Sequence, residues 1–90
     1  MAFPIYKKDP NSVLDFTFNW GAWLDGDTIS TSSTTVGAGL TKDSESNTTT
    51  AATVWLSGGT AGTSYTVANR ITTAASRIED RSITVQVENL

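Results

Sequence analysis

Arg81-Ser82-Ile83-Thr84-Val85-Gln86-Val87-Glu88 alternates apolar and polar residues almost without a break. Ile83, Val85 and Val87 fall on one side of an extended chain, and the polar residues fall on the other. Side chains of a strand repeat every two residues, so the pattern predicts a β-strand with one buried face and one solvated face. Because parallel sheets are covered on both faces, a wet face is typical of antiparallel sheets. The stretch therefore predicts an antiparallel all-β protein.

A second strand-length run, Ser64 to Thr72, precedes this stretch and is rich in β-branched and aromatic residues. Such residues fit a pleated, half-buried surface. Only a short segment separates the two runs, so they are predicted to form a hairpin whose tip is Ala74-Ala75-Ser76-Arg77.

Shorter patterns predict the remaining strands. Residues 13–20 alternate, and the side chains expected to face the core are Leu14, Phe16, Phe18 and Trp20. A weaker strand is expected over residues 28–36, and a further strand over residues 48–56. Residues 41–47 are polar and charged, which predicts an exposed loop or an edge. Gly21-Ala22-Trp23-Leu24 breaks the alternation, which indicates a helical turn or a bend.

About seven short strands, with turn signals roughly every 8–12 residues, indicate an immunoglobulin-like antiparallel β-sandwich. Another small β-barrel or sandwich is the alternative. Tyr65 supports the first fold, because it lies at the start of the penultimate strand, just after the glycine-rich turn at residues 58–62. Immunoglobulin-like domains often place a tyrosine there, and its hydroxyl bonds to the backbone upstream.

The chain is predicted to consist of an extended N-terminal arm, residues 1–11, and one immunoglobulin-like domain, residues 12–90. Both prolines lie in the arm, and proline disfavours helical backbone geometry at the residue before it. Phe3, Ile5 and Tyr6 are apolar residues on a segment without a core of its own. They are expected either to add an edge strand to this sandwich or to dock on a neighbouring subunit.

The composition argues against several kinds of chemistry. The 90 residues include no cysteine and no histidine, so the chain offers no thiolate or imidazole zinc site, no Ser-His-Asp triad and no cysteine nucleophile. A non-enzymatic protein without a metal or cofactor is expected. The net charge is −3 and the six basic residues are dispersed, which argues against nucleic acid as a partner. No apolar run is long enough to span a bilayer.

The three tryptophans are candidates for the core or for an interface. Trp20 follows the alternation of its strand and is expected in the core. Trp23 is expected either to cap the core or to be exposed, and Trp55 to be half-buried or outward. An exposed tryptophan is more often a protein-interface anchor than a platform for sugar stacking. The candidate interface residues are Phe3, Ile5, Tyr6, Trp23 and Trp55.

Four segments carry a resemblance to a known family: Val13-Leu14-Asp15-Phe16-Thr17-Phe18-Asn19-Trp20, Trp23-Leu24, the run from Thr53 to Val67, and Arg81-Ser82-Ile83-Thr84-Val85. They resemble a family of short, immunoglobulin-like virion proteins of tailed bacteriophages, often described as fibre–tail adaptors. The resemblance covers nearly the whole chain from Asp9 onward. It implies a sandwich fold and an attachment role, and it brings no catalytic residues.

The resulting expectation is a bacteriophage virion structural protein that joins the tail fibre to the tail or head–tail interface by protein–protein binding. Its partners would be other virion proteins, and several copies would occupy a symmetric assembly. It would be assembled in the host bacterial cytoplasm, which agrees with the missing cysteines and the missing secretory signal. The alternatives are a capsid decoration protein and a glycan-binding adhesion module.

Overall fold

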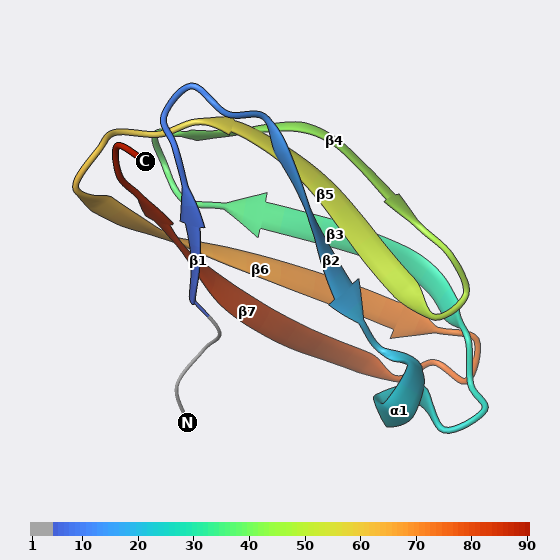
Figure 1. Ribbon diagram of the computed structural model, residues 1–90. Coiled ribbons are helices and arrows are strands. Elements are labelled where there is room, and N and C mark those ends of the chain that lie inside the picture. Colours follow the sequence, from blue (N-terminus) through green and yellow to red (C-terminus); the bar gives the residue numbers. More distant parts are fainter. Residues whose placement is uncertain (1–4) are drawn as a thin grey trace.

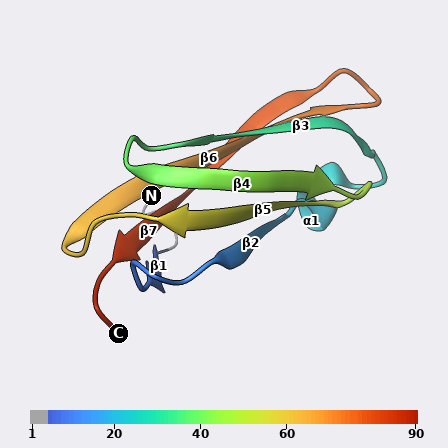
Figure 2. The ribbon, with the colours of Figure 1, turned by 90° about the horizontal axis from the view of Figure 1, so that it is seen from above.

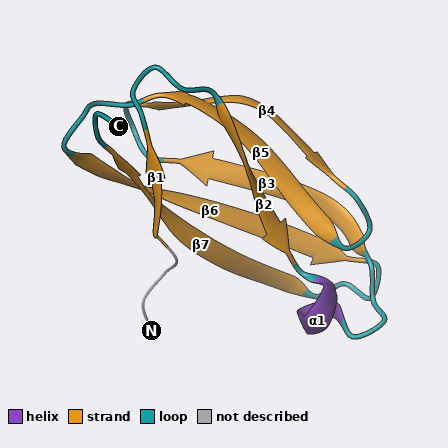
Figure 3. Ribbon diagram, viewed as in Figure 1, coloured by secondary structure: helices purple, strands orange, loops and turns teal. Residues whose placement is uncertain are grey.

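The computed structural model describes residues 5–90, which form two packed β-sheets and one helical turn (Figures 1 and 3). In chain order the elements are β1 (Ile5–Lys8), β2 (Leu14–Asn19), α1 (Gly21–Leu24), β3 (Ile29–Val36), β4 (Leu40–Asn47), β5 (Ala51–Gly58), β6 (Thr63–Thr73) and β7 (Ile78–Val87). Within residues 5–90, no helix has the length and apolar character needed to cross a membrane.

The strand order confirms an immunoglobulin-like sandwich. One sheet has the order β1-β7-β6-β3 and the other has the order β2-β5-β4. All neighbours pair antiparallel except β1 and β7, which are parallel. The second, fifth and fourth strands thus face the third, sixth and seventh, as in immunoglobulin domains. Figure 2 shows β4 and β5 crossing over β6 and β7 of the other layer.

The β6–β7 hairpin supplies one wall of the core, as its alternation predicts. Val67 pairs with Ile83 and Tyr65 with Val85, and all four side chains are buried. The opposite wall comes from β5, where Ala52, Val54 and Leu56 are buried. The core therefore lies between the inward faces of the two sheets.

Strand β2 confirms three of the four inward residues predicted for it. Phe16 and Phe18 are buried, and Trp20, directly after the strand, is fully buried. Leu14 is the exception, because 38% of it is exposed. It is the first residue of an edge strand, so no further strand covers it on its free side.

Two segment predictions differ in detail from the structure. The strand expected over residues 48–56 begins at Ala51, because the Thr48 hydroxyl accepts hydrogen bonds from the amides of Thr50 (3.3 Å) and Ala51 (3.1 Å). Threonine hydroxyls compete in this way with strand formation. Residues 41–47 belong to the edge strand β4, and residues 21–24 form the helical turn α1.

The N-terminal segment supplies an edge strand of this same sandwich. Tyr6 pairs with Val85 and Lys8 with Val87. Lys8 is fully buried, and its ammonium donates to the carbonyl oxygens of Gly58 (2.8 Å) and Asp9 (3.0 Å). Lys8 therefore ties β1 to the end of β5 in the other sheet. The boundary drawn between residues 11 and 12 stays a prediction.

Tyr65 forms the corner contact that its position predicts. The amide of Thr60 donates a 2.9 Å hydrogen bond to the Tyr65 hydroxyl, which fixes the turn between β5 and β6. The ring packs against the turn before β4, where a Cβ on Gly39 would lie 3.2 Å from the ring and its hydroxyl. Gly39 has a φ of 102°, so both its conformation and its neighbour favour glycine.

Candidate docking surfaces

The structure distributes the candidate interface residues over separate parts of the sandwich. Ile5 and Tyr6 lie on β1, Trp23 lies in α1, and Trp55 lies on the central strand of the three-stranded sheet. Phe3 lies outside the described residues. These side chains therefore do not form one common surface, and each position is considered by itself.

Strand β1 presents two apolar side chains at the edge of the four-stranded sheet. Ile5 is 64% exposed and Tyr6 is 44% exposed. The Tyr6 ring meets Phe16 edge-on with a centroid distance of 5.6 Å, so part of its surface is used within the molecule. Ile5 pairs with Thr84, whose side chain belongs to the outer face of the sheet.

Trp23 is occupied by contacts within the chain. It packs partly buried against the core, and its ring lies 5.4 Å from that of Trp20. The guanidinium of Arg77 lies 4.2 Å above the Trp23 ring. Arg77 also donates to the Asp27 carboxylate (3.1 Å) and to the carbonyl oxygen of Leu24 (2.8 Å). Trp23 therefore anchors α1 to the hairpin tip rather than offering a free ring.

The Asp27 carboxylate accepts several hydrogen bonds at this end of the sandwich. A hydrogen bond from the Thr73 side chain is the largest cause that lowers the pKa of Asp27 to about 2. The Thr28 amide (2.8 Å), Arg77 and the Ala75 amide (3.3 Å) add to it. The carboxylate is thus engaged in holding α1, β3 and the hairpin together.

A buried polar network joins Trp20 to two strands. Its indole N–H donates to Oδ1 of Asn69 (2.9 Å), and the Asn69 amide donates to the hydroxyls of Ser32 (2.8 Å) and Thr34 (3.1 Å). The guanidinium carbon of Arg81 lies 4.3 Å from the centre of the Trp20 ring. Every polar atom in the network has a partner, as a buried site requires.

Trp55 is the tryptophan that points away from the core. It is 42% exposed, between the buried Val54 and Leu56. Its cross-strand neighbours are Asp15 on β2 and Ser44 on β4. Asp43 lies on the same outer face, because its carboxylate accepts a 3.0 Å hydrogen bond from Ser57, two residues after Trp55. The ion pairs formed within residues 5–90 include neither Asp15 nor Asp43.

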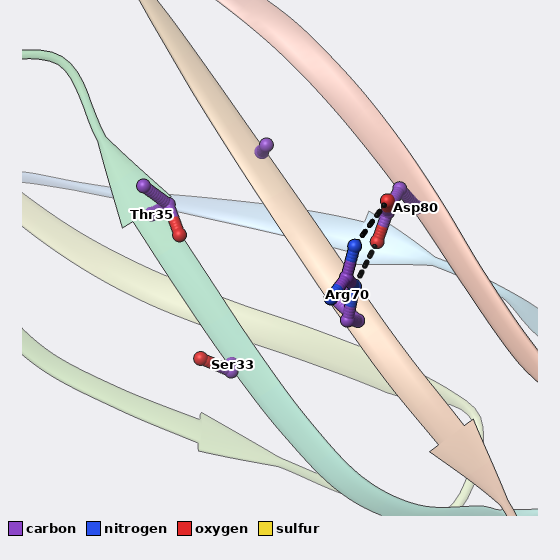
Figure 4. A pocket seen from close by; sticks show the side chains of 5 residues that line it. Ser33, Thr35, Arg70 and Asp80 are labelled. Carbon is purple, nitrogen blue, oxygen red and sulfur yellow. Dashed lines mark hydrogen bonds and ion pairs between the residues drawn. The ribbon is translucent and has the colours of Figure 1, made fainter.

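The outer face of the four-stranded sheet contains a shallow polar hollow (Figure 4). Its lining side chains are Ser33, Thr35, Ala68, Arg70 and Asp80. Arg70 makes two hydrogen bonds to Asp80, 2.8 and 3.1 Å long. This pairing raises the pKa of Arg70 and lowers the pKa of Asp80. The hollow combines small hydroxyl side chains with an ion pair that is already satisfied.

One sheet edge is closed to strand addition by side chains. The amide of Thr34 on β3 donates to Glu45 (2.9 Å), and its carbonyl accepts from Lys42 (3.1 Å). Lys42 and Glu45 also pair with each other at 3.3 Å. Because unpaired edge groups attract other strands, this arrangement protects β3.

Three further side chains on the outside of the sandwich were missed from the sequence. Val13 and Ile78 are exposed apolar side chains, and Asp15 faces Trp55 across the sheet. The alternation of residues 13–20 already places Val13 and Asp15 on the outward face. The sequence did not show that β2 pairs with β5, and this pairing is what places Asp15 next to Trp55. In the part of the chain that the structure describes, no cluster of three or more His, Cys, Asp or Glu side chains could hold a metal ion.

A comparison with protein families gives one match. A family model described as "Podophage GP4 fiber-tail adaptor protein gp77" matches residues 8–86. The match runs from the last residue of β1 to the penultimate residue of β7, and so spans both sheets. A search of curated proteins finds no match.

Proposed function

Because the chain belongs to the podophage GP4 fiber-tail adaptor protein gp77 family, we propose that it joins a tail fibre to the tail or head–tail interface by protein–protein binding alone. The observation that carries the proposal is the extent of the family match. It covers both sheets, apart from the first three residues of β1 and the last residue of β7, rather than one motif within them.

The shape of the molecule supports a role between two partners. The sandwich measures 42 × 28 × 19 Å, and turns gather at both ends of its long dimension (Figure 1). One end carries α1, the β4–β5 turn and the tip of the β6–β7 hairpin. The other carries the β1–β2, β3–β4 and β5–β6 turns and the C-terminus. The two ends and the two outer sheet faces are separate surfaces, so two partners can bind at the same time.

The chemistry of the side chains supports binding rather than catalysis. The chain has no histidine or cysteine to act as base or nucleophile. The three carboxylates whose pKa is lowered all have partners within the chain. Asp27 holds the hairpin tip, Asp80 pairs with Arg70, and Asp9 accepts hydrogen bonds from the amides of Asn11 and Leu90. A small domain of this kind gains stability when it docks on a larger assembly. Several copies in a symmetric ring agree with the usual architecture of oligomers.

The direct test removes the protein from the particle. A phage in which this gene is disrupted is expected to yield tailed particles without attached fibres, seen by negative-stain electron microscopy. Adding the purified chain is expected to restore attachment, whereas an unrelated sandwich domain of similar size is expected not to. Normally fibred particles from the disrupted phage would contradict the proposal. Fibred particles with fragile capsids would favour a decoration protein instead.

A further inference from the structure

Two of the three tryptophans carry an arginine on the ring. Arg77 lies 4.2 Å from the centre of Trp23, and Arg81 lies 4.3 Å from the centre of Trp20. At Trp23 a third group completes the arrangement, because Asp27 accepts a hydrogen bond from the same guanidinium. The ring attracts the cation from one side while the carboxylate fixes its orientation.

Trp55 has the ring and the carboxylate of this arrangement without the arginine. Asp15 lies directly opposite Trp55 in the β2–β5 register, and side chains so placed are close neighbours on one sheet face. Asp43 adds a second carboxylate on that face, where it accepts a hydrogen bond from Ser57, two residues after Trp55. Of the cation–π contacts within residues 5–90, none involves Trp55.

We propose that the Trp55 face, defined by Asp15, Asp43, Ser44 and Trp55, binds an arginine side chain presented by a protein partner. The inference rests on the proposed adaptor function and names the chemistry of one of its two contacts. The planar guanidinium stacks on the indole and donates to Asp15 at its edge. Arginine fits this role better than lysine, because its fork of donors pairs with a carboxylate while its plane lies on a ring.

A second copy of this chain is a poor source of that arginine. Arg70 is paired with Asp80, and Arg77 is held by Trp23 and Asp27. Arg81 lies on Trp20 and donates to the carbonyl oxygen of Asn19 (2.7 Å). Each of the three arginines is thus engaged within its own molecule. The partner is therefore a different protein, which agrees with an adaptor between unlike components.

The test measures binding of the purified chain to two probes, fibre-free particles from the disrupted phage and purified fibre protein, by co-sedimentation. Trp55→Ala is expected to weaken binding to one probe at least tenfold and to leave the other unchanged. Trp55→Phe keeps an aromatic face and is expected to retain most of the affinity, whereas Trp55→Leu is expected to lose as much as Trp55→Ala. The matched control is Ile78→Ala, an exposed apolar residue on the other sheet, with binding unchanged.

A second variant tests the two carboxylates of the Trp55 face. It also keeps the inference testable if Trp55→Ala fails to fold. Asp15→Asn combined with Asp43→Asn removes both charges without changing side-chain size. This variant is expected to weaken binding to the same probe and to reduce the dependence of that binding on salt. Melting temperatures within about 2 °C of the wild type would show that folding is intact.

Each remaining outcome has a definite meaning. If the wild type binds both probes and Trp55→Ala binds them within twofold, the inference is wrong and the adaptor function stands. If Trp55→Leu binds as well as Trp55→Phe, the contact is apolar packing, and the inference that an arginine side chain binds there is wrong. Binding to a glycan array that Trp55→Ala abolishes would replace the protein partner with a sugar. If the wild type binds neither probe, the proposed function fails and the inference fails with it.

Discussion

Trp20 and Trp55 are the same kind of residue in opposite environments. Trp20 is fully enclosed and bonded to Asn69, whereas Trp55 shows nearly half of its surface to solvent. The alternation of residues 13–20 was sufficient to predict the burial of Trp20. Arg77 and Arg81 were missed as ring partners, because each lies more than fifty residues from the tryptophan it covers. Sequence spacing carries no signal for such pairs.

The two tryptophans give a direct test at this scale. Trp20→Ala is expected to lower the free energy of unfolding by about 3–5 kcal/mol, since it leaves a cavity and removes the partner of Asn69. Trp55→Ala removes a side chain that is 42% exposed, so the loss is expected to be smaller, about 1–2 kcal/mol. Urea unfolding followed by circular dichroism measures both. Equal losses for the two variants would show that the strand faces are wrongly assigned.

Tyr65 permits a test of a single hydrogen bond. Tyr65→Phe removes the hydroxyl that accepts from the Thr60 amide and is expected to lower the free energy of unfolding by about 1 kcal/mol. The control is Tyr6→Phe at an exposed position on β1, for which no change is expected. If thermal melting shows the same effect for both, the corner contact does not stabilise the turn.

The lowered pKa of Asp27 predicts how stability varies with pH. Its value of about 2 in the folded chain lies below the ordinary 3.8, so the ionised form is favoured by folding. The resulting stabilisation is complete above about pH 5 and is lost as the pH falls toward about 2. Asp27→Asn is expected to melt below the wild type at pH 7, with a gap that narrows as the pH falls through this range.

A neighbouring residue provides the control for this pH effect. Asp25 is exposed and lies in the same turn, with a φ of 48° that asparagine adopts readily. Asp25→Asn is therefore expected to melt at the same temperature as the wild type at pH 7. A gap between wild type and Asp27→Asn that stays constant down to pH 2 would contradict the assignment.

At the scale of elements, patterning predicts strands well and their ends less well. The β6–β7 hairpin and β2 follow from period-two alternation. The start of β5 could not be predicted from the alternation. Thr48 forms hydrogen bonds to the local backbone, so the strand begins three residues later than expected, at Ala51. The place of β1 was left open, since four extended residues carry no information about which edge they join. The buried Lys8 gave no apolar signal at all.

Lys8 provides the test of how β1 is held. Lys8→Ala removes the buried stem and both hydrogen bonds to carbonyl oxygens, so the free energy of unfolding is expected to fall by about 1–3 kcal/mol. Hydrogen exchange is expected to rise in residues 5–8. Lys7→Ala is the matched control, because Lys7 is exposed and its pair with Glu88 contributes about 0–1 kcal/mol. Indistinguishable exchange in the two variants would mean that Lys8 does not fasten β1.

At the scale of the whole molecule, an adaptor is defined by its position between the tail and the fibre. Charge, composition and the absence of histidine and cysteine already favoured binding over catalysis. Family membership then directed the proposal to the fibre and tail. The choice of contact surface needed the structure, because the Trp55 face combines residues from β2, β4 and β5 that only sheet pairing brings together.

The most direct measurement is an electron cryomicroscopy map of the intact virion with this subunit located. We expect density for a two-sheet sandwich, 42 Å in its longest dimension, between the tail and the base of the fibre. We also expect a different protein to cover the outer side of β5. Density for the sandwich spread over the capsid lattice, or fibres that meet the tail with no such subunit between them, would contradict the proposed function.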